Sequence, residues 1–103
     1  MLSIRDLKFD PILYNANRFP QKMEPDLEKA RKLIAECNHL VIFTPVWWYG
    51  LPAYFKGFVD RVFFKGFAFV FTPETRKRKR LLEGKSVRVI YTQGATKWES
   101  IFI

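Results

Sequence analysis

The fold is decided by residues 39–63, which read HLVIFTPVWWYGLPAYFKGFVDRVF. Residues 39–44 form a short, nearly continuous apolar run. It lacks the alternation of a strand with one wet face, so it predicts a strand buried on both faces, as in a parallel sheet. Pro45 ends this strand, and an aromatic loop leads to Gly50. A helix is predicted from Pro52, because apolar residues then recur at i, i+3, i+4, i+7 and i+8, namely Phe55, Phe58, Val59, Val62 and Phe63.

The flanking segments extend the same alternation of strands and helices. Residues 2–7 alternate weakly and predict a short strand, and residues 8–24 read as a loop. Pro25 suits the first position of a helix that Asn38 is expected to close. Residues 86–92 predict a further strand. The order strand, helix, strand, helix, strand predicts right-handed crossovers and a parallel sheet.

Composition narrows the class of protein. A length of 103 residues indicates a single domain, 1–103. Apolar residues make up 49% and charged residues 27%, which is typical of a globular chain. The single cysteine, Cys37, excludes an internal disulfide and favours a reducing, cytoplasmic setting. The N-terminus lacks a secretory signal pattern, and no run approaches the roughly 18 apolar residues of a membrane span.

Much of the net charge of +8 lies in one run, Arg76–Arg80, which reads RKRKR. We expect a solvated surface loop here. Such a run is also compatible with nucleic acid, or with the phosphates of NADPH. No aromatic residue is interleaved with it, so the sequence predicts that nucleic acid is an unlikely partner.

Two segments follow predicted parallel strands at their carboxyl ends, where ligands of open α/β sheets bind. The first is the aromatic loop after residue 44, and the second is a small polar loop after the last strand. Three consecutive large aromatic side chains cannot all point inward from one loop. Simple packing and a site for a flat, polar-edged ring such as an isoalloxazine both remain open. The candidate site residues are Pro45, Val46, Trp47, Trp48, Tyr49, Thr92, Gln93 and Gly94.

Several motifs carry a family resemblance over residues 4–96. They are the P-x-W-W loop at 45–48, P-A-x-x-K-G at 52–57, D-R-V-F at 60–63 and L-E-G-K at 82–85 before a strand ending in TQG. In these motifs the chain resembles the NAD(P)H:quinone reductase family, whose members are also called NAD(P)H dehydrogenases (quinone).

The resemblance implies an α/β, flavodoxin-like three-layer sandwich with a parallel sheet in the order 2-1-3-4-5. The matched stretch starts at the family's second strand. Its first and last strands and its phosphate-binding loop have no counterpart, so an incomplete sandwich, truncated at both ends, is expected. Ala95 replaces the second glycine of the usual pair.

The resemblance also implies a function. It implies a flavin-dependent oxidoreductase that uses FMN or FAD and transfers hydride from NAD(P)H to quinones or similar acceptors. Pro45 to Tyr49 would lie along the flavin ring, and Thr92, Gln93 and Gly94 would contact its polar edge. The 52–63 helix would help to form a homodimer. The catalytic residue is unknown, with Tyr49 and Tyr91 as candidate general acids. The alternative is a non-catalytic truncated relative that acts as a dimerising or ancillary interaction subunit.

The remaining polar residues are given structural roles. His39 opens a strand with no nucleophile placed beside it, and Cys37 falls on the apolar face of a helix. Asp60 and Arg61 are consecutive on a helix, so each is expected to pair elsewhere. No zinc-ligand spacing is present in the sequence, and no metal is expected.

Overall fold

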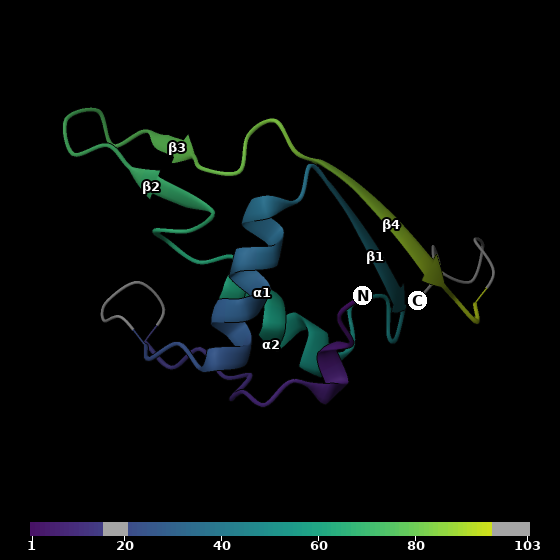
Figure 1. Cartoon of the computed structure of the whole chain (residues 1–103). Helices are drawn as coiled ribbons and strands as arrows, with labels where there is room; N and C mark the ends of the chain where they lie inside the picture. Colours follow the sequence, from purple (N-terminus) through teal and green to yellow (C-terminus); the bar gives the residue numbers. More distant parts are fainter. Residues whose placement is uncertain (16–20, 96–103) are drawn as a thin grey trace.

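A computed structural model describes residues 1–15 and 21–95 (Figure 1). A parallel pair of strands forms its centre, with His39 opposite Ser86 and Pro45 opposite Thr92. The fold is therefore α/β with a parallel sheet, as the sequence predicts. The elements of the described residues are η1 (Ile4–Asp6), α1 (Pro25–Glu36), β1 (His39–Pro45), α2 (Ala53–Val62), β2 (Phe69–Phe71), β3 (Arg78–Arg80) and β4 (Ser86–Thr92).

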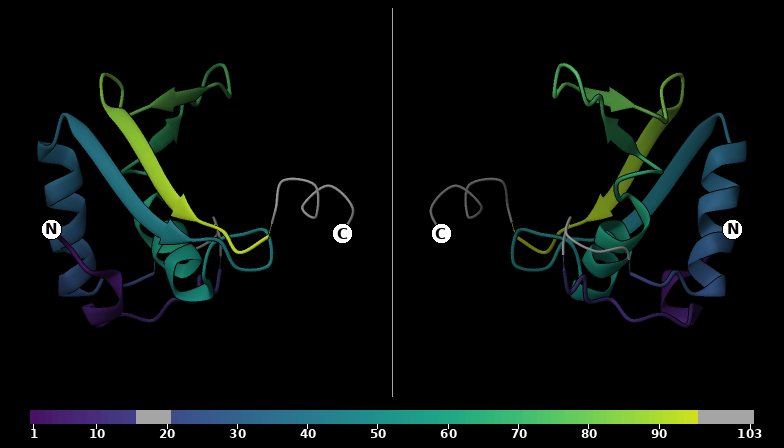
Figure 2. Two further views of the ribbon diagram at one scale, coloured as in Figure 1. Left: turned by 90° about the vertical axis from the view of Figure 1, so that its right-hand side faces the viewer. Right: turned by 90° about the vertical axis from the view of Figure 1, so that its left-hand side faces the viewer.

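Both long helices lie on the same side of the β1–β4 pair (Figure 2). The core forms between them, and Leu40 of β1 packs against it from the sheet. Its buried apolar side chains are Leu27, Ala30, Ile34, Phe58 and Val62. In the described residues the sheet thus has a helical layer on one face, which gives two layers of the expected sandwich.

The helix limits differ slightly from those predicted. Pro25 is the first residue of α1, but Cys37 caps its C-terminus and Asn38 lies beyond it. The Asn38 carbonyl instead accepts the Ser86 amide at 3.1 Å, which starts the pairing between β1 and β4. Helix α2 starts at Ala53, because Pro52 has extended dihedral angles and serves as the N-cap.

The strand predicted over residues 2–7 is wrong, because Ile4–Asp6 form a 3-10 turn. The Asp6 and Leu7 amides donate to the carbonyls of Ser3 and Ile4, both at 3.1 Å. An extended segment needs a neighbouring strand to take its backbone hydrogen bonds. In the described residues no strand pairs with this segment, so it satisfies those groups locally. The Tyr54 hydroxyl then anchors it by donating to the Leu7 carbonyl at 2.7 Å.

The loop predicted for the basic run is also wrong in part, because Arg78–Arg80 form β3 and pair antiparallel with β2. Arg76 has a φ of 52° in the turn of this hairpin. The Thr72 amide donates to the Lys77 carbonyl at 3.0 Å, which closes the turn. Cross-strand pairing therefore makes the last three residues of the charged run a strand, which the composition of the run did not indicate.

Strand β1 was expected to be buried on both faces, and in the described residues it is buried on one. Thr44 faces the helices and is buried, whereas Phe43 points the other way and is 69% exposed. Every residue of β4 is exposed, including Val87 and Val89. Apolar strands of this kind are typical of a sheet that has further layers or neighbours.

Candidate functional site

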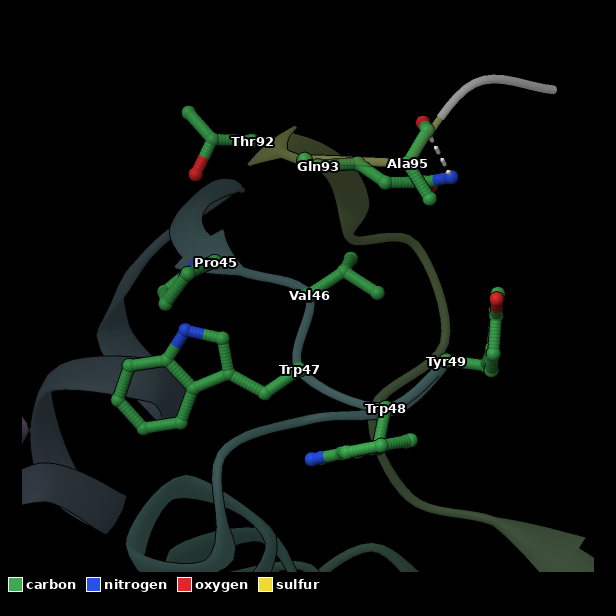
Figure 3. Close-up of a pocket in the computed structure, with 9 residues that line it drawn as sticks. Pro45, Val46, Trp47, Trp48, Tyr49, Thr92, Gln93 and Ala95 are labelled. Carbon is green, nitrogen blue, oxygen red and sulfur yellow. Dashed lines mark hydrogen bonds between the residues drawn. The ribbon is translucent and has the colours of Figure 1, made fainter. Parts of the chain in front are cut away.

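The two predicted loops meet at the carboxyl ends of β1 and β4 (Figure 3). Together they line an open hollow of about 760 Å³. The structure brings all eight sequence-predicted residues to this one hollow, and adds Ala95. The residues that line it are Pro45, Val46, Trp47, Trp48, Tyr49, Thr92, Gln93, Gly94 and Ala95.

A backbone hydrogen bond holds the two loops against each other. The Val46 amide donates to the Thr92 carbonyl at 2.8 Å, which continues the β1–β4 pairing beyond the last strand residues. In the second loop the Gln93 side-chain amide donates to the Ala95 carbonyl at 3.1 Å. The floor of the hollow is thus an extension of the parallel sheet.

The aromatic loop is a tight two-residue turn in a strained conformation. The amides of Trp47 and Gly50 donate to each other's carbonyls at 3.0 and 3.1 Å. Between them, Trp48 and Tyr49 have φ angles of 51° and 61°. Two positive φ values define a type I′ turn, in which Asn and Gly are preferred. Bulky side chains in this region are costly, and such strain clusters at functional sites.

The strained turn displays its aromatic side chains instead of burying them. Trp48 is 92% exposed and Trp47 is 61% exposed. In Figure 3, Trp47 and Tyr49 extend to opposite sides of the loop, and Thr92 and Gln93 lie across from them. The hollow therefore offers flat apolar surfaces facing hydroxyl, amide and backbone polar groups, which suits a planar ring with a polar edge.

The candidate general acids are placed differently. Tyr49 lines the hollow. Tyr91 lies one residue before the hollow in β4, opposite Thr44 of β1. Of the two, Tyr49 is the one positioned to contact a molecule bound there.

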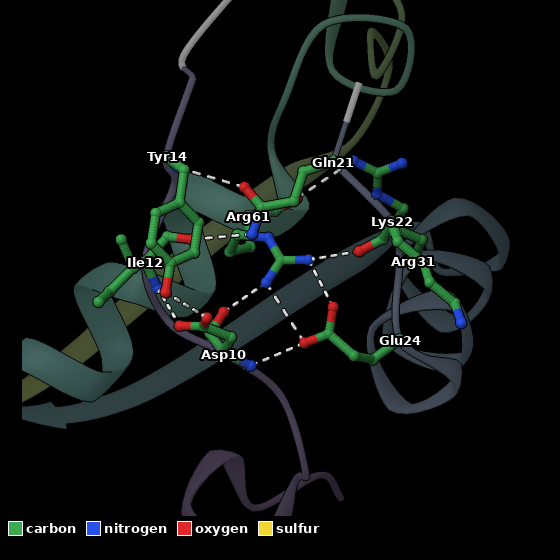
Figure 4. Close-up of polar contacts among 8 residues, drawn as sticks. All are labelled: Asp10, Ile12, Tyr14, Gln21, Lys22, Glu24, Arg31 and Arg61. Atoms are coloured by element: carbon green, nitrogen blue, oxygen red, sulfur yellow. Dashed lines mark hydrogen bonds and ion pairs between the residues drawn. The ribbon is translucent and has the colours of Figure 1, made fainter. Parts of the chain in front are cut away.

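A polar cluster outside the hollow centres on Arg61 (Figure 4). The sequence predicted only that Arg61 pairs with a residue other than Asp60. Arg61 is 2% exposed. Its guanidinium donates to the carbonyls of Asp10 and Lys22 and forms an ion pair with Glu24 at 2.5 Å. The hydrogen bonding of Glu24 with the Arg61 guanidinium lowers the pKa of the Glu24 carboxyl. The expectation that Asp60 and Arg61 each pair elsewhere than with each other is confirmed, because Arg61 pairs with Glu24 and Asp60 pairs with Lys56. Its position three residues after Phe58, on the apolar face of α2, is the sequence signal for burial.

The same cluster orders the segment before α1. The Glu24 carboxylate also accepts the Asp10 amide at 2.7 Å. The Asp10 carboxylate accepts the Ile12 amide at 2.9 Å and the Tyr14 hydroxyl at 2.7 Å, which lowers the pKa of Asp10 and raises that of Tyr14. The cluster thus ties residues 10–14 and 21–24 to α2, the helix that follows the aromatic loop.

Arg31 joins the two helices at the edge of this cluster. It donates to the carbonyls of Val62 and Arg61 at 3.0 and 3.2 Å, and its guanidinium lies 5.0 Å from the centre of the Phe67 ring. Burial lowers the pKa of Arg31. Its contacts satisfy the carbonyls at the end of α2, so its role is structural.

The residues given structural roles by sequence lie outside the hollow. His39 Nδ1 is 2.6 Å from the Ser86 hydroxyl and links β1 to β4. The Cys37 thiol is half-buried, and its sulfur is 3.2 Å from the Ile34 carbonyl. Among residues 1–15 and 21–95, no three His, Cys, Asp or Glu side chains lie close enough together to hold a metal ion. In the same residues, no helix is long and apolar enough to cross a membrane.

Comparison with known proteins gives the family. A family described as having a flavodoxin-like fold matches residues 2–100. An uncharacterized NAD(P)H oxidoreductase of Haemophilus influenzae is 31% identical over 97 residues, covering 87% of this chain and 45% of that protein. Human ribosyldihydronicotinamide dehydrogenase (quinone) is 30% identical over 76 residues, covering 74% of this chain and 32% of that protein.

A solved structure agrees with these sequence matches. Smu.1420 from Streptococcus mutans UA159 superposes with a TM-score of 0.70 at 35% identity, covering 92% of this chain and 51% of that one. The chain thus spans about half the length of that protein, and less than half of the relatives above. The flavodoxin-like topology and the shared motifs show that the chain belongs to the flavodoxin-like NAD(P)H:quinone reductase family.

Proposed function

We propose that the protein takes part in flavin-dependent NAD(P)H oxidoreduction, with quinones or similar compounds as acceptors. The observation that carries this proposal is the hollow at the carboxyl ends of β1 and β4, with its strained aromatic turn. The relatives named as NAD(P)H oxidoreductases and quinone dehydrogenases support the same reaction class. FMN and FAD share the ring system that this hollow suits.

The ring end of a flavin fits the residues that are present. Trp47 and Trp48 offer indole surfaces for stacking, and Thr92, Gln93 and Gly94 offer polar groups for the edge of the ring. The described residues suit the phosphate group of a flavin less well than its ring. The first turn of α1 carries Asp26 and Glu28, whose charges oppose an anion at that helix end.

A bound flavin would supply the hydride chemistry. The chain's own residues would position the ring and exclude water from one side of it. The Trp47–Gly50 turn fixes the loop, and the Val46–Thr92 hydrogen bond fixes its distance from the polar loop. Of the two candidate general acids, Tyr49 would be the one beside a bound electron acceptor, because it lines the hollow. We propose a cytoplasmic setting, because Cys37 is a free thiol.

The test is a titration of the protein with FMN and with FAD, followed by tryptophan quenching and visible absorbance after desalting. Saturable quenching is expected, and Trp47→Leu should weaken it by about tenfold or more, since stacking adds to the area that a ring buries. Phe43→Leu is the matched control, because Phe43 is an exposed aromatic residue of β1 outside the hollow. A colourless protein without saturable quenching would sink flavin binding by this chain.

The strained turn gives a second test of the same site. Replacing Trp48 with Asn and Tyr49 with Gly supplies the residues that a type I′ turn prefers. The free energy of unfolding, measured in urea, should rise by about 1–3 kcal/mol, because each strained position costs on that order. Flavin affinity should fall. If stability does not rise, the turn is not strained, and strain is no argument for a site.

A non-catalytic interaction subunit is the second candidate, and the bare apolar strands favour it. Val87, Val89 and Tyr91 of β4 are more than half exposed in the described chain. Sedimentation analysis of the purified protein separates the candidates when it is read beside the flavin titration. A stable homodimer that binds no flavin would favour the interaction role, and a flavin-binding species would favour the enzyme.

A further inference from the structure

The cations of strand β3 lie on two opposite faces of the β2–β3 hairpin. Arg78 lies opposite Phe71 of β2. Arg80 lies opposite Phe69. Directly opposed residues share a face of a sheet, so both arginines lie on the face that carries the two rings. Lys79 lies on the other face. We name the first of these the arginine–aromatic face.

Contacts within the hairpin hold the arginine–aromatic face in place. The Arg78 guanidinium lies 6.0 Å from the centre of the Phe69 ring. The rings of Phe69 and Phe71 meet edge to face, with their centres 5.6 Å apart. Phe71 is 48% exposed, and both arginines are exposed. The face therefore presents guanidinium groups, beside an aromatic surface, to a molecule that lies against it.

The charges of the basic run are not neutralised by the rest of the described chain. None of the ion pairs in residues 1–15 and 21–95 involves the run at 76–80. The run has five consecutive cations, and the hairpin turn before it has one carboxylate, Glu74. Its attraction for an anion therefore grows with the charge of that anion.

The aromatic hollow lacks the charge that the hairpin has in excess. Among the described residues that line it, none has a charged side chain. The reductant of the proposed reaction carries a pyrophosphate, and NADPH carries a 2′-phosphate in addition, with a charge of about −1.5 to −2 at pH 7. The hollow thus offers surfaces for rings, and a counter-charge for the phosphates has to come from another part of the protein.

A second copy of the chain brings the two features together. Figure 1 shows the hairpin near the start of β4, whereas the hollow lies beyond the end of that strand. A seven-residue strand is about 23 Å long, at about 3.3 Å per residue, so the hairpin is remote from the hollow of its own chain. In a symmetric dimer with its two-fold axis near the middle of β4, the hairpin of each copy comes to the hollow of the other.

We propose that Arg78 and Arg80 of one copy bind the 2′-phosphate of NADPH at the hollow of a second copy, so that the protein selects NADPH over NADH. A guanidinium group donates paired hydrogen bonds to a phosphate, and an arginine accommodates the 2′-phosphate in dinucleotide-binding folds. The inference rests on the proposed oxidoreductase function and names the reductant of that site.

The test compares NADP+ with NAD+ by isothermal titration calorimetry, on protein saturated with FMN or FAD, whichever binds in the flavin titration. NADP+ should bind about tenfold or more tightly than NAD+, because hydrogen bonds between charged groups are the strong ones. Arg78→Gln combined with Arg80→Gln should bring the two affinities within about twofold of each other, with flavin affinity unchanged. Lys79→Gln is the matched control, because it removes a charge from the opposite face and should keep most of the preference.

A mixed dimer tests whether the site is shared between copies. One chain carries Arg78→Gln and Arg80→Gln, the other carries Trp47→Leu in the hollow, and each has its own affinity tag. If the hairpin serves the hollow of the other copy, one site of the mixed dimer keeps both features and the second site lacks both. NADP+ should then bind with the original affinity at about half of the original stoichiometry.

The outcomes separate this inference from the function on which it rests. A chain that binds no flavin overturns the proposed function, and this inference with it. A flavin-loaded chain that binds NADP+ and NAD+ equally overturns this inference alone. It is also overturned if the arginine variant loses affinity equally for both nucleotides, which would assign the arginines to the pyrophosphate, or if Lys79→Gln matches that variant. A mixed dimer without a site of original affinity would exclude a site shared between copies.

Discussion

The helical side and the strand side of the molecule both carry large apolar side chains, yet these side chains are buried to very different extents. On the helical side Leu27 and Val62 are 0% exposed. On the strand side Phe43 is 69% exposed and Val87 is 57% exposed. An apolar side chain favours burial, but it is buried only where other elements pack against it.

The two sides also differ in how their polar groups are satisfied. Between the helices and the N-terminal segment, the buried Arg61 contacts two carbonyls and one carboxylate. At the end of the strands, the polar groups of Thr92 and Gln93 stay exposed beside the aromatic turn. The buried contacts are concentrated in the first region, and the proposed binding site lies in the second.

The largest expected effect is that of Arg61→Ala. This change removes the Arg61 donor from Glu24 and from two backbone carbonyls, so the free energy of unfolding should fall by about 3–5 kcal/mol. Urea unfolding followed by circular dichroism measures it. Lys56→Gln is the control, because it breaks an exposed ion pair on the same helix and should cost less than about 0.5 kcal/mol. Equal losses in the two variants would contradict the special role of the buried cluster.

A pair of truncations tests the contrast between the sides directly. Leu27→Ala removes a fully buried side chain and should cost about 2–5 kcal/mol. Phe43→Ala removes a larger but mostly exposed side chain and should cost within about 0.5 kcal/mol. Thermal unfolding of both variants under one condition gives the comparison. A large loss of stability in Phe43→Ala would mean that the strand side is covered in solution. Sedimentation would then test whether a second copy of the chain covers it.

Gly57→Ala tests the close approach of α2 to the N-terminal segment. A Cβ at Gly57 would lie 2.3 Å from the Pro11 Cβ and 2.7 Å from the Pro11 carbonyl oxygen. The segment must then shift, at a cost of about 1–3 kcal/mol. Chemical denaturation measures it. Gly50→Ala is the matched control, because its nearest neighbour would be 4.0 Å away. If both variants match the original chain, the segment is not packed on α2.

The smallest expected effect is a dependence of stability on acid pH. The Arg61 hydrogen bonds lower the pKa of Glu24 below its usual 4.5. A carboxyl with a lowered pKa contributes its full stabilisation above pH 4.5 and loses it as pH falls through the folded value. The free energy of unfolding should therefore decline below about pH 4.5, with a shallower decline in Glu24→Gln. Asp10 titrates in the same direction, so Asp10→Asn is measured alongside. A rise in stability toward acid would contradict the sign.

Local signals were sufficient wherever an element's own pattern decides its structure. The 3.6-residue period of α2, Pro25 at the start of α1 and the apolar run of β1 each predicted the element that forms. The strand order then placed Pro45–Tyr49 beside Thr92–Gly94, because parallel strands end at the same edge of a sheet. These residues meet in one hollow, and their use for a flavin stays a prediction.

Local signals failed where a partner segment decides the outcome. Ile4–Asp6, within the strand predicted over residues 2–7, form a 3-10 turn because no described strand accepts their hydrogen bonds, and Arg78–Arg80 form a strand because β2 does. The burial of Arg61 likewise depends on carbonyls that are 39 and 51 residues away along the chain.

The sequence by itself determined the α/β class, the family and the chemistry of the two loops, because periodicity and motifs are written in consecutive residues. Only the tertiary structure decided which apolar faces are covered, that Trp48 and Tyr49 sit in a strained turn, and that Phe69 and Phe71 share a face with two arginines. The covered faces depend on packing between distant segments, and the shared face depends on pairing between β2 and β3. Pairing and packing fix such contacts, and no local pattern encodes them.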